Sequence, residues 1–104
     1  MDSDRFVYTA ADQSTTGGFD TIQGFTHGLD LIDFTTITAM ASVQGLISGA
    51  TNVNANSIAW LESGGNTQLL VNTTAGSELQ EAVQMKIVLS GTSLGLSASD
   101  FLLA

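Results

Sequence analysis

The chain has 104 residues, of which ten are acidic and two basic, so its formal net charge is −8 and its isoelectric point is about 4.1. Nucleic acids and anionic membrane surfaces are poor partners, because proteins bind both through Lys and Arg, and only Arg5 and Lys86 are present. The absence of cysteine excludes disulfides and thiolate metal sites. Cations are the natural complement of this charge, although the hydration of an acidic surface also explains it.

Length and hydrophobic content predict one folded domain spanning residues 1–104. We expect no membrane insertion, because no apolar run approaches the length that crosses a bilayer. The N-terminal sequence MDSDRFVY lacks the basic and apolar regions of a classical signal peptide. If the protein leaves the cell, it uses another route.

Short runs of β-branched and aromatic residues among Thr, Ser, Gly and Asn favour an all-β fold. The first run, RFVY, predicts a strand with Phe6 and Tyr8 on one face and Val7 on the other. Residues 11–18 read as a loop. The segment 20–34, DTIQGFTHGLDLIDF, has apolar residues at helical spacing, but its two glycines disfavour a helix. We therefore predict a loop there, followed by a strand in LDLIDF.

The rest of the chain predicts at most one short helix and several strands. Residues 39–48 have the spacing of a short helix, with Met40, Val43 and Ile47 on one side. The clearest local unit is a β-hairpin, in which SIAWLES and TQLLVNTT flank Gly-Gly-Asn. The run AVQMKIVL follows, and its alternating residues predict a strand with one apolar face made of Val83, Met85, Ile87 and Leu89. A terminal strand, DFLLA, closes the chain.

Several short motifs invite a chemical interpretation that their context weakens. GTSLG at residues 91–95 matches a nucleophile elbow, but that motif needs a large α/β sheet and a downstream histidine. His27, the sole histidine, is better explained as an exposed loop residue than as a zinc ligand. Asn72 begins a glycosylation sequon, a pattern that is common by chance. Trp60 is a carbohydrate-stacking platform or, as we favour for an alternating strand, part of the core.

Acidic residues gather in the first third of the chain, mostly beside Gly, Ser or Thr. They are Asp2, Asp4, Asp12, Asp20, Asp30 and Asp33. Carboxylates on such loops bind calcium in many proteins, although the EF-hand spacing is absent. They also cap turns by accepting hydrogen bonds from backbone N–H groups. The sequence leaves both roles open.

Three blocks taken together, DRFVY, DTIQGFTHGLDLIDFT and KIVLSGTSLGLSASDFLLA, resemble the C-terminal secretion-target domain of type I secreted RTX proteins, as in serralysin-type metalloproteases. The resemblance covers nearly the whole chain. It implies an all-β, β-sandwich-like domain that caps a parallel β-roll of calcium-binding, glycine-rich repeats. It also implies that residues 1–104 are a C-terminal fragment of a larger protein that is secreted to the extracellular space by Gram-negative type I export.

The resemblance assigns roles residue by residue. Asp4 matches an aspartate that binds calcium together with the preceding repeat, and Asp20, Asp30 and Asp33 match aspartates of the central block. The C-terminal residues match an uncleaved export signal, which is read by an ABC transporter with its membrane-fusion and outer-membrane partners. These are Asp100, Phe101, Leu102, Leu103 and Ala104.

The expected function is therefore non-catalytic, and any enzymatic activity would belong to the upstream part of the parent protein. The alternative is an extracellular adhesin-like or carbohydrate-binding β-sandwich that uses Trp60 or the acidic loops.

Overall fold

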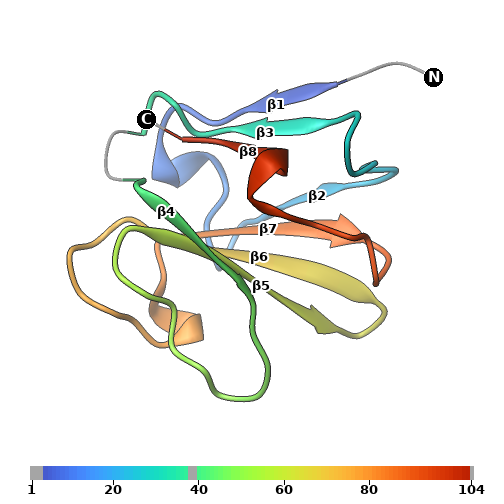
Figure 1. Cartoon of the computed structure of the whole chain (residues 1–104). Helices are drawn as coiled ribbons and strands as arrows, with labels where there is room; N and C mark the ends of the chain where they lie inside the picture. Colours follow the sequence, from blue (N-terminus) through green and yellow to red (C-terminus); the bar gives the residue numbers. More distant parts are fainter. Residues whose placement is uncertain (1–3, 38–39, 104) are drawn as a thin grey trace.

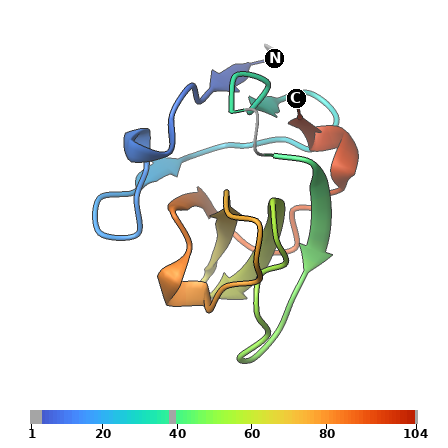
Figure 2. The ribbon, with the colours of Figure 1, turned by 90° about the vertical axis from the view of Figure 1, so that its left-hand side faces the viewer.

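The structure is a computed structural model that describes residues 4–37 and 40–103, and it consists of two β-sheets that enclose a shared core (Figures 1 and 2). The smaller sheet has the order β1-β3-β8, and all of its neighbours are parallel. Its strands are β1 (Arg5–Val7), β3 (Leu31–Asp33) and β8 (Phe101–Leu102). The sheet thus joins the beginning of the chain to its end.

The larger sheet has the order β2-β7-β6-β5-β4. Its strands are β2 (Asp20–Ile22), β4 (Ser42–Leu46), β5 (Ser57–Ser63), β6 (Asn66–Asn72) and β7 (Met85–Ser90). The three central strands β5, β6 and β7 are antiparallel, whereas β2 and β4 pair in parallel at the two edges. The helical elements described are three single 3-10 turns, η1 (Ala11–Gln13), η2 (Gln80–Ala82) and η3 (Ala98–Asp100). The predicted all-β, two-layer fold is confirmed.

The β5–β6 hairpin forms as its sequence predicts. Ser63 pairs with Asn66, so the turn consists of Gly64 and Gly65 alone. Both have positive φ, 62° and 81°, which is the conformation of the type I′ turn that matches the twist of a hairpin. The predicted strand after it is β7. Three of its predicted core residues, Met85, Ile87 and Leu89, are fully buried between the sheets.

The predicted helix over residues 39–48 is wrong, because β4 occupies Ser42–Leu46. Gly45 has φ 102°, which is incompatible with a helix, and the pairing with β5 shifts by one residue at this point. The apolar residues of the segment are still largely inward, since Met40 and Ile47 are buried. Hydrophobic spacing found the buried side chains but assigned the wrong period.

Two hydrophobic clusters lie on opposite faces of the larger sheet. The main one lies between the sheets, where Trp60 of β5 contacts Phe101 of β8 with ring centroids 5.5 Å apart. The second cluster, on the outer face, is built from Ile47, Val53, Ala59, Leu70 and Val83. Val83 therefore packs apart from the alternating residues with which the sequence grouped it.

Candidate functional site: buried aspartates around the C-terminal tail

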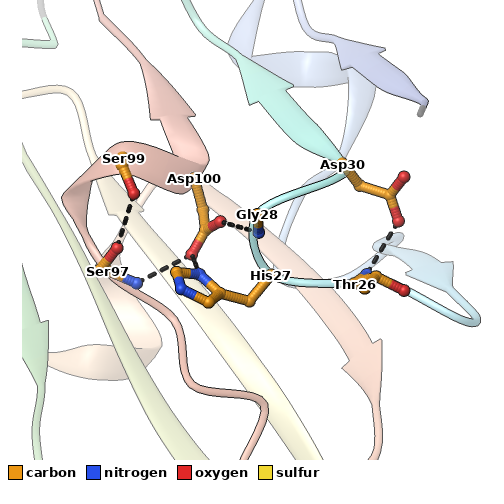
Figure 3. Close-up of polar contacts among 7 residues, drawn as sticks. All are labelled: Thr26, His27, Gly28, Asp30, Ser97, Ser99 and Asp100. Atoms are coloured by element: carbon orange, nitrogen blue, oxygen red, sulfur yellow. Dashed lines mark hydrogen bonds and ion pairs between the residues drawn. The ribbon is translucent and has the colours of Figure 1, made fainter.

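The C-terminal tail, residues 97–103, consists of Ser97, η3, the short strand β8 and Leu103, and it lies beside the loop 24–30 (Figures 1 and 3). Asp100 ends η3 and is buried, with a side chain only 1% exposed. Its carboxylate accepts a hydrogen bond from the backbone N–H of Ser97 at 2.9 Å, while its own N–H donates to the Ser97 carbonyl. These two hydrogen bonds of Asp100 thus lie within the tail.

The other hydrogen bonds of Asp100 join the tail to the loop 24–30, which is distant in the sequence. Nδ1 of His27 lies 2.6 Å from Oδ2, and the N–H of Gly28 donates to Oδ1 at 3.2 Å (Figure 3). A carboxylate only accepts hydrogen bonds, so Nδ1 of His27 carries the hydrogen. The imidazole itself is 43% exposed. The loop position expected for His27 is confirmed, and its side chain binds the tail to the loop.

Asp30 binds the loop 24–30 to the residue that precedes β1. Its two carboxylate oxygens accept hydrogen bonds from the backbone N–H groups of Thr26, at 2.8 Å, and Asp4, at 2.9 Å. Asp30 is buried, with 4% exposed. The carboxylate therefore closes its own loop and holds the residue that leads into β1.

Asp33, at the end of β3, has the strongest set of donors. Thr35 donates to Oδ1 from its hydroxyl at 2.6 Å and from its backbone N–H at 2.8 Å, and Nε of Arg5 donates to Oδ2 at 2.7 Å. The Thr35 bonds, followed by those from Arg5, lower the pKa of Asp33 from 3.8 to about 2. Arg5 is the partner in the one ion pair with a permanently charged base among the residues described.

Asp20 lies on a different part of the surface, at the start of β2. It is exposed, and its Oδ2 accepts a hydrogen bond from the hydroxyl of Tyr8 at 3.0 Å. Burial, together with this bond and the charge of Asp20, raises the pKa of Tyr8 well above its usual value. The contact links the smaller sheet's first strand region to an edge of the larger sheet.

The four predicted calcium ligands, Asp4, Asp20, Asp30 and Asp33, do not gather at one place. Asp4 touches Asp30 through its backbone, whereas Asp33 and Asp20 have other partners. Within residues 4–37 and 40–103, no three His, Cys, Asp or Glu side chains form a group that could hold a metal ion. The carboxylates of Asp30 and Asp33 accept hydrogen bonds in the way that turn caps do. Their calcium role stays a prediction.

The tail residues predicted as an export signal are placed together. Phe101 and Leu102 form β8, and Leu103 packs against the main core. Ala104 lies outside the described residues. Their role in export stays a prediction, but their structural context is clear: in the folded domain, Asp100 and Phe101 are buried.

Sequence reasoning missed the partners of these carboxylates. Thr26, His27, Gly28 and Thr35 supply donors, yet none of them was a candidate for this role. The order D-x-T at 33–35 is a recognisable signal, because an aspartate accepts readily from the residue two positions later. The pair His27 and Asp100 has no such local signal, since the two residues are 73 positions apart.

Three other motifs are now explained by the fold. Trp60 is 7% exposed and belongs to the core, which removes the stacking platform of the carbohydrate-binding alternative. Asn72 is fully buried and donates to the carbonyls of Val53, Asn54 and Gly76, so its amide is not available for glycosylation in the folded domain. The GTSLG segment follows β7 as a loop that contains no helix.

The lowered pKa of Asp33 predicts a specific acid sensitivity. Because the folded state favours the ionised carboxylate, its contribution to stability is complete above pH 3.8 and disappears as the pH falls towards 2. Asp33→Asn should lower the melting temperature at pH 7, and its difference from the unmodified protein should shrink between pH 4 and pH 2.

Thermal melts across this pH range, followed by circular dichroism, provide the measurement. The control is Asp12→Asn at an exposed carboxylate, which should follow the unmodified protein throughout. A difference between Asp33→Asn and the unmodified protein that stays constant from pH 7 to pH 2 would contradict the assignment.

Comparison with known proteins agrees with these observations. No curated protein matches the chain significantly. The family model described as Peptidase M10 serralysin C terminal matches residues 1–103, which include the loop 24–30, Asp33 and the whole tail. The chain therefore belongs to the serralysin C-terminal domain family.

Proposed function

We propose that this chain is the non-catalytic C-terminal domain of a larger secreted protein, in which it closes a calcium-binding β-roll of RTX repeats and carries the type I export signal in its tail. Family membership supports a secretion-related C-terminal domain. The observation that carries the finer proposal is the all-parallel sheet β1-β3-β8, which has an outer strand at one edge and the C-terminal tail at the other.

The outer edge of β1 suits an upstream roll. Figure 1 shows β1 as the outermost strand of its sheet. Tyr8 N–H and the Asp4 carbonyl bond towards β3, so by the alternation of a parallel ladder the backbone groups of Arg5 and Val7 face outwards. A β-roll consists of parallel strands, and one further parallel strand beside β1 would continue its ladder.

An exposed apolar side chain and a hollow lie at that edge. Val7 is 52% exposed, and a hollow of about 350 Å³ lies beside it, lined by Phe6, Val7, Tyr8, Gln13 and Asp20. Exposed apolar groups next to an unpaired strand edge are the usual mark of a surface that another segment protects. The preceding repeats are the segment that we propose.

The tail suits a signal that is read before folding. Asp100 and Phe101 are buried in the folded domain, whereas an unfolded chain exposes them to the transporter and its membrane-fusion and outer-membrane partners. Among the residues described, no helix is long and apolar enough to cross a membrane. An extracellular destination through type I export is part of the same proposal.

Calcium enters this proposal through the repeats. The described residues of this chain bring no three metal-binding side chains together. Asp4 is exposed and lies just before β1, where the repeats would contribute further oxygen ligands. We propose that Asp4 shares a calcium ion with the last repeat, and that Asp20, Asp30 and Asp33 contribute at most weak binding of their own.

Export is tested by fusing residues 1–104 to a small passenger protein. The fusion should leave only those cells that hold a matching type I transporter, and deletion of residues 100–104 should abolish export. Secreted and intracellular amounts of the passenger are the measurement, and Asp12→Asn serves as the exported control. Equal export of the truncated fusion would overturn the signal assignment.

The capping role is tested with Val7→Pro, which removes an outward-facing N–H from β1 but keeps the bonds to β3. The melting temperature of residues 1–104 should change by a few degrees at most. In a chain with glycine-rich repeats placed before Met1, the same substitution should clearly lower the melting temperature of the repeats in calcium. An unaffected repeat module would argue against docking at this edge.

Calcium dependence gives a separate test. Excess calcium should raise the melting temperature of residues 1–104 only slightly, because the residues that the structure describes bring no three metal-binding side chains together. With repeats upstream, calcium should stabilise strongly, and Asp4→Asn should reduce that gain whereas Asp12→Asn should not. An increase of tens of degrees for residues 1–104 alone would show that this chain contains its own calcium site.

A further inference from the structure

The tail is bound by parts of the chain that lie far from it in sequence. The carboxylate of Asp100 is held by His27 and Gly28 of the loop, and the ring of Phe101 packs on Trp60 of β5 (Figure 3 shows the loop contacts). The backbone N–H of Phe34 donates to the carbonyl of Leu102 at 2.8 Å. Through these three contacts the rest of the domain binds the carboxylate of Asp100, the ring of Phe101 and the backbone of Leu102, which are consecutive residues.

The attachment of the tail is short compared with the rest of the fold. Strand β8 pairs with β3 at two positions only, Ile32 with Phe101 and Asp33 with Leu102. In contrast, β5 and β6 pair at seven positions. The second hydrophobic cluster, on the outer face of the larger sheet, contains no tail residue. Loss of the tail therefore leaves the pairing of the larger sheet and one of its two apolar faces intact.

The segment before the tail has the backbone of a hinge. Gly91, Ser93 and Gly95 have φ of 97°, 54° and 74°, so the chain reverses through three left-handed residues between β7 and η3. Ser93 is not a glycine and carries a conformational cost in this state. Its position is fixed by a hydrogen bond from its N–H to Glu62 at 2.8 Å. Extension of this segment would relieve that cost.

We propose that residues 97–103 are a separable ligand of the domain. The tail leaves the place that it fills between the loop 24–30, β3 and Trp60, here called the groove, as a unit while the five-stranded sheet stays folded. The groove then binds an extended peptide in which Asp, an aromatic residue and aliphatic residues follow one another. The natural occupant is the chain's own tail. This inference concerns the folded domain and does not depend on an export role, so its failure and that of the export proposal are distinguishable.

Trimming of the 104-residue chain by a carboxypeptidase tests the separate release. Removal of Leu102 and the residues before it requires the tail to detach, and mass spectrometry follows it. Global unfolding is measured independently by urea titration with circular dichroism. If only globally unfolded molecules were trimmed, the trimming rate would be set by the unfolded fraction. We expect the measured rate to be at least tenfold higher than that.

Two variants test the contact between His27 and Asp100. His27→Ala removes a half-exposed side chain and should speed trimming several-fold with little change in the urea midpoint, and Asp100→Asn should speed it further. Glu81→Gln, at an exposed residue of η2, is the control and should leave the rate unchanged. Trimming that follows global unfolding in every variant would overturn the proposal.

Recognition by the groove is tested with an added peptide, C-terminally amidated SASDFLLA, which resists the carboxypeptidase. Because the attached tail has an effective concentration on the order of millimolar, millimolar peptide should displace it and accelerate trimming saturably. The emission of Trp60, the sole tryptophan, should be retained, since the peptide restores its aromatic neighbour. Amidated SASNFLLA and SASDALLA are the matched controls. Equal effects of all three peptides, or no effect of SASDFLLA, would refute recognition by the groove.

Discussion

A buried carboxylate in this protein must be satisfied chiefly by uncharged donors, because ten acidic residues face only two basic ones. Asp30, Asp33 and Asp100 are all buried, and together they take up N–H groups from the loop 24–30, from the residue two positions after β3 and from the tail. Each such bond removes the cost of a charge or a polar group that would otherwise be buried alone. Indeed, no buried side-chain N or O atom among the residues described lacks a partner.

These bonds determine the geometry of the smaller sheet. Its strands are only two or three residues long, which is too short for backbone pairing to fix them. Asp30 fixes the entry to β1, Asp33 joins β1 to β3 through Arg5, and Asp100 joins β8 to the loop before β3. The larger sheet differs in this respect, because its long central strands and its two apolar faces support each other. The larger sheet is held by the hydrogen bonds between its strands, and the smaller sheet by aspartate side chains at the ends of its strands.

The sequence predicted what depends on neighbouring residues and missed what depends on distant ones. The β5–β6 hairpin, the alternation of β7 and the inward faces of Phe6 and Tyr8 were all predictable, because their signals lie within a few residues. The strand β2 was missed, since its three residues form a strand only beside β7. For β4, tertiary pairing with β5 overrides the helical spacing. In the candidate site, the aspartates were identified, but the tie between His27 and Asp100 depends on the packing of the whole chain.

The order β1-β3-β8 also has a consequence for the course of folding. The meander β5–β6–β7 consists of consecutive strands and can form early, because closing short loops costs little conformational entropy. The smaller sheet instead joins β1 and β8, the first and last strands described, through β3, and its β3–β8 pairing joins residues far apart in the sequence, Ile32 with Phe101 and Asp33 with Leu102. A ribosome-bound chain therefore cannot complete this sheet until Phe101 and Leu102 have left the ribosome. Among the strands described, β8 joins its sheet last, after β5, β6 and β7 are already available for pairing.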